Sequence, residues 1–197
     1  LRYAPKTFLQ RRPNVTGAWS QTAIVGTTMN WTADLEGVKR VVYRLPELKD
    51  RQAIVWCEGE KDVDAAWALG IPAPCGNEGA LPWRPYFGDQ LTTQGVRRVA
   101  ILPDNDVPGL AHAESVAAGL HRLGLEVRIV ALPDLRAHGD LSDYLAAGHT
   151  RDELLGLIKA TSVWAPPVVS LSEPRFLVLG EQRYRMTLPQ GVVLEVT

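Results

Sequence analysis

The sequence has few of the features that mark several common classes of protein. Of its 197 residues only two are cysteines, Cys57 and Cys75, and neither belongs to a Cys-x-x-Cys pair or a His/Cys cluster. This argues against structural zinc and a disulfide framework and favours a reducing cytoplasm. No apolar run approaches the roughly 20 residues that a membrane span needs, and no signal-peptide pattern is present. The chain also contains no Walker A sequence, which excludes a helicase motor within these residues.

Neither sign of charge is in excess, because 21 Lys and Arg face 22 Asp and Glu and the formal net charge is -1. The charges are nevertheless unevenly distributed. Residues 2–51 contain nine Lys and Arg against four acids, a difference of five positive charges, while the remainder is acidic. Within residues 2–51, turn-forming residues separate short strand-like segments, the last of which spans residues 38–43 and ends before Pro46. We therefore expect a small basic lobe with β structure over residues 1–52.

From residue 53 the pattern changes to alternating strands and helices. The apolar runs at 53–57 and 99–102 are typical of strands that are covered on both faces of a parallel sheet. Strands are predicted at 53–57, 99–102 and 127–132, and helices at 60–69, 108–123, 142–147 and 151–160, the last with a Thr150/Glu153 capping box. This order predicts an α/β domain over residues 53–160, with a parallel sheet flanked by helices.

The segment 161–197 is expected to form a linker and a short β extension. Pro166-Pro167 interrupts the chain, and strand-like segments follow at 176–179, 183–188 and 192–196. These strands could be an accessory hairpin or the start of a further domain. Because the chain opens on Leu1 and stops within a strand-like segment, we interpret it as a piece of a longer polypeptide.

Acidic residues follow two of the predicted strands. Glu58 ends the first strand, and Asp104 and Asp106 end the second. Functional groups in open α/β sheets gather beyond the carboxyl ends of the strands, and residues two apart in extended chain project to the same side. Taken singly, an Asp-x-Asp sequence is typical of a solvated turn or a helix cap. Three converging carboxylates, however, repel one another unless a cation joins them, and Mg²⁺ or Mn²⁺ suits oxygen ligands that leave room for phosphate.

Three motifs resemble the TOPRIM signature of primases, topoisomerases, recombination proteins and OLD-family nucleases. They are Glu-Gly-Glu-Lys-Asp at 58–62, Asp-Asn-Asp at 104–106 with Pro-Gly at 108–109, and Gly-Asp-Leu-Ser-Asp at 139–143. Tyr-Arg-Leu-Pro-Glu-Leu at 43–48 and Arg-Arg-Pro at 11–13 make the chain more similar to primases and primase-helicases of phages and mobile elements. The resemblance covers about residues 2–158. It implies a TOPRIM (Rossmann-like) fold with an N-terminal lobe and a C-terminal extension.

The resemblance also implies roles for the acidic residues. Glu58 would be the acid/base or metal-proximal glutamate, and Asp104 and Asp106 would bind Mg²⁺ or Mn²⁺. Asp62 and Asp140 would be supporting acids, although Asp62 fits equally well as a helix-start acid favoured by the helix dipole. The remaining ionisable candidates, interpreted as solvated or capping residues, are Asp143, His112, His121, His138 and His149.

Several basic residues are candidates for binding nucleotides and nucleic acid. Lys61, at the start of a predicted helix, could meet a triphosphate. Five more basic residues lie among aromatic residues of the N-terminal stretch and could form a phosphate track for single-stranded DNA: Arg11, Arg12, Lys39, Arg40 and Arg44. An equally weighted alternative is that these arginines and lysines are the solvated face of the small lobe.

Three functions remain open on the sequence. The leading hypothesis is a DNA primase core that joins ribonucleoside triphosphates on a single-stranded DNA template, with a helicase as its partner in the same chain or as a separate protein. The second is a TOPRIM nuclease or strand-cleaving enzyme, and the third is a DNA-binding module without turnover. In each case the expected location is the cytoplasm of a bacterial or phage-infected cell, with no membrane partner.

Overall fold

The computed structural model describes residues 40–76 and 83–167 with their side chains, and the backbone of seven short strands outside these ranges. Those strands are β1 (Arg2–Tyr3), β2 (Thr7–Phe8), β3 (Arg12–Pro13), β4 (Trp31–Thr32), β8 (Arg175–Gly180), β9 (Arg183–Thr187) and β10 (Val193–Val196). Strands β1 with β2, and β3 with β4, form antiparallel pairs, as expected of a β-containing N-terminal part. Strands β8, β9 and β10 form an antiparallel sheet, which confirms the predicted β extension.

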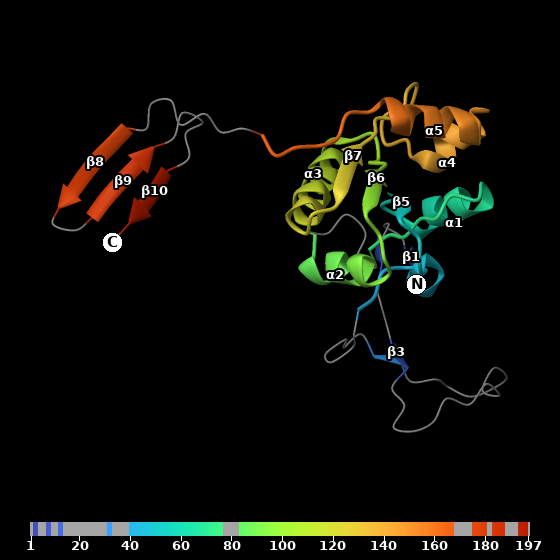
Figure 1. The fold of residues 1–197 in the computed structure, drawn as a ribbon, viewed down its shortest axis with the longest axis horizontal. Coiled ribbons are helices and arrows are strands. Elements are labelled where there is room, and N and C mark those ends of the chain that lie inside the picture. Colours follow the sequence, from blue (N-terminus) through green and yellow to red (C-terminus); the bar gives the residue numbers. More distant parts are fainter. Residues whose placement is uncertain are drawn as a thin grey trace.

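A parallel sheet lies at the centre of the described residues (Figure 1). Its order is β5 (Ala53–Trp56), β6 (Arg98–Ile101) and β7 (Glu126–Ile129). The helices are η1 (Leu45–Leu48, a 3-10 helix), α1 (Glu60–Ala68), α2 (Pro85–Thr93), α3 (Val107–Arg122), α4 (Leu141–Ala146) and α5 (Arg151–Ala160). The predicted α/β fold, a parallel sheet flanked by helices, is therefore confirmed. No helix in the described part of the chain is long and apolar enough to cross a membrane.

Helices cover both faces of this sheet because its strands are apolar on both sides. Ile54 and Trp56 of β5 pack in a core with residues of α2 and α3, such as Leu91 and Leu120. Val55, between them in the sequence, packs in a second core with residues of α1, α4 and α5. Successive residues of a strand point to opposite faces, so one apolar run supplies both cores. Figure 1 shows α2 and α3 on one side of the sheet and α1, α4 and α5 on the other.

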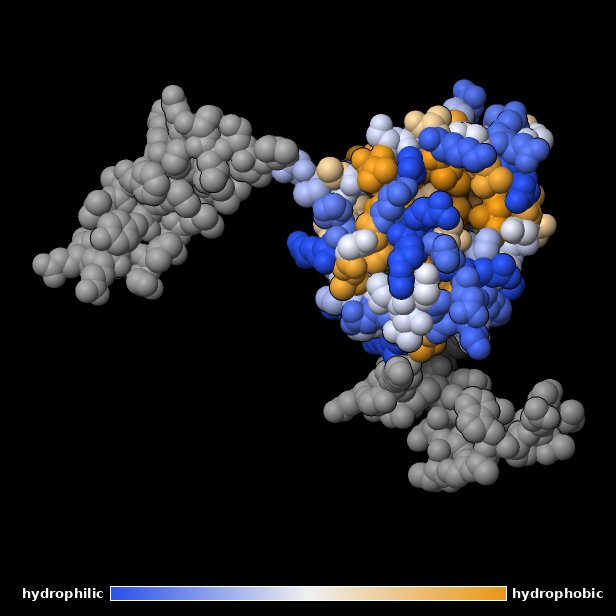
Figure 2. Space-filling view, viewed as in Figure 1, coloured by the Kyte–Doolittle hydropathy of each residue, from blue (hydrophilic) through white to orange (hydrophobic). Residues whose placement is uncertain are grey.

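The surface of this α/β unit is mixed. Figure 2 shows hydrophilic residues over most of the visible face, with hydrophobic residues between them in separate patches. The exposed large hydrophobic residues among those described are Val41, Val107, Leu110, Leu123 and Val163.

Helix α2 was not predicted, and its packing explains why it forms. Pro85 opens it, while Gly88 and two threonines at its end give it a low intrinsic helix propensity. A Cβ atom at Gly88 would lie only 2.3 Å from a side-chain carbon of Leu123, so the glycine lets α2 approach the end of α3 closely. Tertiary packing of Phe87 and Leu91, both buried, supplies the stability that local propensity does not.

The predicted strand at 38–43 is wrong for residues 40–43, where the structure has no strand. The side chain of Gln90 takes the place of a neighbouring strand: its Oε1 accepts a hydrogen bond from the Val42 N–H (2.9 Å) and its Nε2 donates to the Arg40 carbonyl (2.9 Å). Val42 and Leu48 are buried in the core with Ile54, so packing of the α/β unit begins before residue 53. The domain boundaries after residues 52 and 160 stay predictions.

Both edges of the parallel sheet are occupied by extended chain. The Pro72 and Pro74 carbonyls accept hydrogen bonds from the N–H groups of Val55 (2.9 Å) and Cys57 (3.2 Å). At the opposite edge, the Trp164 N–H donates to the Val127 carbonyl at 2.7 Å. The Trp164 indole N–H also donates to Glu114 of α3 at 2.9 Å. The chain that leaves α5 is thereby fixed against β7 and α3.

Candidate metal-binding and catalytic site

Glu58 and Asp104 meet because they follow neighbouring parallel strands. Trp56 of β5 is in register with Ile101 of β6, so the residues just beyond these two positions leave the sheet side by side. The Asp104 N–H donates a hydrogen bond to Oε1 of Glu58 at 3.1 Å. The two residues are thus in contact at the carboxyl edge of the sheet, and their role as metal ligands stays a prediction.

Gly109 brings Asp106 into the same group. A Cβ atom built on Gly109 would lie 2.6 Å from the Asp104 carbonyl oxygen, 2.7 Å from Oε1 of Glu58 and 3.1 Å from Oδ1 of Asp106. The carboxylates of Glu58 and Asp106 therefore both lie close to Gly109 in the first turn of α3. A side chain at residue 109 would force the Asp104 backbone or these carboxylates to shift. The sequence contained a signal for this role, since a buried glycine in the first turn of a helix points to close approach of another group.

Asp106 is held at both carboxylate oxygens. It is the N-cap of α3, and its Oδ1 accepts a hydrogen bond from the Gly109 N–H at 2.7 Å. Its Oδ2 lies 2.8 Å from Nδ1 of His138. The hydrogen bond from His138 and then that from Gly109 lower the pKa of Asp106, so the carboxylate is ionised and His138 is the donor. This contact was not predicted from the sequence, because the spacing of the four histidines contains no signal for it.

Asp62 and Asp140 lie on the neighbouring elements α1 and α4. Asp62 is buried, and its Oδ1 accepts hydrogen bonds from the Ser142 N–H (2.9 Å) and hydroxyl (2.6 Å). Asp140 is the N-cap of α4 and forms an ion pair with Lys61. Asp143 completes the capping box with Asp140, in agreement with its interpretation as a helix-start acid. These acids tie α1 to α4, and their role as supporting acids of a metal site stays a prediction.

The acidic residues perturb one another. Burial, and then the negative charge of Glu58, raise the pKa of Asp104 to about 7. Burial also raises the pKa of Glu58; the hydrogen bond from Asp104 opposes this shift, and the charges of Asp106 and Asp62 add to it. At Asp140 partial burial alone would raise the pKa, but the hydrogen bonds from Lys61 and the Asp143 N–H outweigh it and lower the pKa. Asp104 and Glu58 are thus acids whose ionised forms an added cation would stabilise.

The donor set suits Mg²⁺ or Mn²⁺ that is completed by water and phosphate. Among the side chains at 40–76 and 83–167, no group of three or more Asp, Glu, His or Cys could hold a metal ion. Mg²⁺ does not need three protein ligands, because it commonly binds one or two carboxylates and keeps water or phosphate oxygens as its other ligands. Glu58 and Asp106 supply two carboxylates close to Gly109, and each oxygen of Asp106 retains a free lone pair beside its hydrogen bond.

The predicted basic residues lie in different environments. Lys61 is 64% exposed beside Asp140, next to the acidic site. Arg44 donates two hydrogen bonds to Asp64, at 2.7 and 3.0 Å, and lies 5.5 Å from the ring centre of Trp67. Arg11 and Lys39 lie outside the described residues, only the backbone of Arg12 is described, and Arg40 offers its carbonyl to Gln90. The described residues do not test a shared phosphate track, and binding of nucleic acid by these basic residues stays a prediction.

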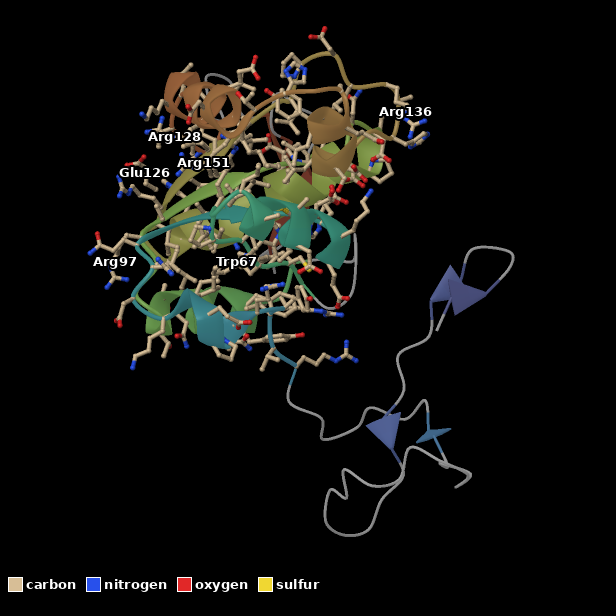
Figure 3. The ribbon with its side chains drawn as sticks, turned by 90° about the vertical axis from the view of Figure 1, so that its right-hand side faces the viewer. Trp67, Arg97, Glu126, Arg128, Arg136 and Arg151 are labelled. Atoms are coloured by element: carbon tan, nitrogen blue, oxygen red, sulfur yellow. The ribbon has the colours of Figure 1, made fainter. Side chains whose placement is uncertain are left out.

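The ends of the sheet differ in their charged residues. Figure 3 shows Arg136 at one end of the α/β unit and Arg97 and Glu126 at the other. Arg136 pairs with Asp143 at 3.2 Å, so it lies on the same side as the acidic group. Arg97 and Glu126 adjoin the amino ends of β6 and β7. The candidate site thus lies at the carboxyl end of the sheet, and Arg97 and Glu126 lie at the opposite end.

Comparison with known proteins places this geometry in a known fold. No model of a known protein family matches the chain. The Gene 57 protein of Mycobacterium phage D29 is 37% identical over 98 residues, which are 50% of this chain and 57% of that protein. The primase of Aquifex aeolicus (zinc-binding and RNA polymerase domains) superposes with a TM-score of 0.51 at 22% identity, covering 61% of this chain and 28% of that one. A DNA primase domain from Pseudomonas aeruginosa superposes with a TM-score of 0.50 at 23% identity, covering 61% and 38%.

The α/β unit shares its fold with these primase domains. The identities are low, so the likeness establishes the fold and leaves the reaction to the site itself. The chain spans about half of the phage protein and about a third of the primase chains that it matches. Activity, substrates and partners of the whole protein are accordingly matters for proposal.

Proposed function

We propose that this chain is a TOPRIM-type primase unit that carries out Mg²⁺- or Mn²⁺-dependent nucleotidyl transfer, with synthesis of an RNA primer on single-stranded DNA as its reaction. The observation that carries the proposal is the hydrogen bond from the Asp104 N–H to Glu58, together with the approach of the Glu58 and Asp106 carboxylates to Gly109, at the carboxyl ends of two adjacent parallel strands. Burial, and then the nearby charge of Glu58, raise the pKa of Asp104 to about 7, and a divalent cation would stabilise its ionised form. The fold shared with bacterial primase domains supports the same assignment.

Each residue of the site has a proposed role in the transfer reaction. Glu58 and Asp106 would hold the ion, with Asp104 beside them, and the ion would offset phosphate charge and acidify an attacking hydroxyl. Glu58 is half-buried with a raised pKa, which makes it a suitable acceptor for the proton of that hydroxyl. Lys61 presents an exposed ammonium group next to the acids and would attract a triphosphate.

The proposed partners follow from this reaction. Ribonucleoside triphosphates would enter at the carboxyl end of the sheet, and a single-stranded DNA template would be bound by the basic residues 2–51. A helicase, in the same longer chain or as a separate protein, would supply that single strand. The proposed location is the bacterial or phage-infected cytoplasm.

A direct assay distinguishes the candidate reactions. The full chain is incubated with a single-stranded DNA oligonucleotide, labelled ribonucleoside triphosphates and either Mg²⁺ or Mn²⁺, and the products are separated by length. New labelled oligoribonucleotides support the proposal. Shortened DNA would instead assign the site to a nuclease, and retention of unchanged DNA would assign it to a binding module. A parallel reaction in EDTA tests the dependence on metal.

A further inference from the structure

Asn105 joins the turn that carries Asp104 and Asp106 to the loop that precedes α4. Its side-chain Nδ2 donates hydrogen bonds to the carbonyls of Leu135 (2.9 Å) and Arg136 (3.0 Å). Its backbone N–H donates to the Gly139 carbonyl (2.8 Å), and its carbonyl accepts from the His138 N–H (3.0 Å). One residue thus contacts the 135–139 segment through four hydrogen bonds and fixes it against the acidic turn.

This segment delivers His138 to Asp106 in a conformation that local sequence does not favour. The backbone of His138 has φ 61°, in the left-handed region, which residues other than glycine adopt uncommonly, although histidine, asparagine and aspartate do so more often than the others. Its side chain is 78% exposed, so burial does not compensate for this conformation. What the imidazole gains is the 2.8 Å hydrogen bond to Oδ2 of Asp106. A residue held in a sparsely populated conformation beside a candidate site is a reason to suspect a role in that site.

Resting on the proposed function, we propose that Asn105 and His138 are positioning residues for Asp106. Asn105 fixes the 135–139 segment, and Nδ1–H of His138 then holds one oxygen of the Asp106 carboxylate while the Gly109 N–H holds the other. Two donors on two oxygens fix the rotation of the carboxylate about its Cβ–Cγ bond. The remaining lone pairs of Asp106 are left free beside Glu58, because Oδ1 of Asp106 and Oε1 of Glu58 both lie close to Gly109. Hydrogen bonds of this kind to metal-binding side chains typically contribute 10- to 100-fold in metal affinity.

A purely structural role for His138 predicts a different outcome, and substitutions at this residue separate the two. His138→Gly relieves the left-handed backbone but removes the donor. His138→Asn also tolerates the left-handed region and keeps a side-chain N–H donor. If His138 only formed the turn, both variants would match wild type. If it positions Asp106, His138→Gly loses metal affinity and His138→Asn retains most of it.

Asp134→Gly is the matched control. Asp134 lies four residues earlier in the same connection and also has a positive φ, 60°. Its replacement by glycine relieves the same kind of backbone conformation without removing a hydrogen bond to Asp106. Asn105→Ala tests the other half of the proposal, since it removes the side-chain hydrogen bonds to Leu135 and Arg136 and should weaken metal binding through His138.

The measurement is the Mn²⁺ dissociation constant of the full chain by titration calorimetry, with melting curves in EDTA to confirm folding. We expect His138→Gly and Asn105→Ala to bind Mn²⁺ at least 10-fold more weakly than wild type. His138→Asn and Asp134→Gly should stay within about threefold, and His138→Gly should still unfold in a single cooperative transition. Unchanged Mn²⁺ affinity in folded His138→Gly overturns the positioning role. Absence of Mn²⁺ binding in wild type would instead overturn the proposed function.

Discussion

Replacing Asp104 by Asn should stabilise the metal-free protein, although the residue belongs to the candidate site. The change is nearly isosteric, and in the described residues no group donates a hydrogen bond to the Asp104 carboxylate. The substitution removes a negative charge that burial and the nearby Glu58 carboxylate disfavour. It keeps the backbone N–H that donates to Glu58. The variant should therefore melt at a higher temperature than wild type in EDTA.

The pH dependence follows from the sign of the pKa shift. The pKa of Asp104 rises from 3.8 to about 7 on folding, so the folded chain holds a proton that the unfolded chain has lost between these values. The native state is therefore penalised increasingly as the pH rises from about 4 to about 7, and fully above that range. Three pKa units correspond to about 4 kcal/mol, which half-exposure of the side chain reduces to about 1–2 kcal/mol. For a domain of this size that is roughly 4–8 °C in melting temperature.

The assay is a set of melting curves in EDTA at pH 8.5 and pH 4. We expect the gain from Asp104→Asn at pH 8.5 and none at pH 4, where the wild-type side chain is already largely protonated. Asp106→Asn is the control of opposite sign, because the pKa of Asp106 is lowered by His138 and Gly109 and its charge contributes to stability. An Asp104→Asn variant that melts no higher than wild type at pH 8.5, or equally higher at both pH values, would refute the reasoning.

Further predictions concern the reaction, the template and the metal. Glu58→Gln should lower nucleotidyl transfer by about 100-fold or more in the primer assay, with single-stranded DNA affinity unchanged; retention of a tenth of the activity contradicts the role. Replacing Arg11 and Arg12 by Ala should reduce the log-log salt slope of single-stranded DNA binding by about one to two units, whereas an unchanged slope assigns both to a solvated face. Gly109→Ala should cost about 1–3 kcal/mol by denaturant unfolding because its Cβ would lie 2.6 Å from the Asp104 carbonyl, while Gly156→Ala, with open space around it, should be neutral or stabilising. Mn²⁺ at ten times its Kd should raise wild-type stability by ~1.4 kcal/mol; indifference to Mn²⁺ in thermal melting would count against a metal site.

The parts of the fold that sequence predicts are those in which local pattern and tertiary packing agree. The run 53–57 is apolar at every position because both faces of β5 are covered, and such a run is visible without any partner. The Thr150/Glu153 capping box is likewise a local hydrogen-bonded unit, and it occurs where predicted. The proximity of Glu58 and Asp104 could be predicted because parallel neighbouring strands end at the same edge of the sheet.

What the sequence could not predict depends on contacts between distant residues. Gln90 pairs with the backbone of residues 40–42 from a helix 48 positions away, and no periodicity reveals that a side chain will replace a strand. His138 reaches Asp106 across 32 residues through a left-handed turn that Asn105 supports. Helix α2 depends on the close approach that Gly88 allows. In each case one polar or small residue matters through its position in the folded chain.

The occupied edges of the parallel sheet limit how this protein can join larger assemblies. Beyond β5, the outward carbonyls of the 71–75 segment are already used, because the Ala73 carbonyl accepts from the Trp67 indole N–H (2.8 Å) and the Cys75 carbonyl accepts from the Tyr43 N–H (3.0 Å). At the other edge Trp164 already bonds to β7 and is held in place by Glu114. Strand addition, a common route both to complex formation and to unwanted aggregation, is therefore obstructed at either side of the α/β unit. Neighbouring proteins would have to dock on its helices and loops, where their attachment leaves the alignment of β5 and β6 undisturbed.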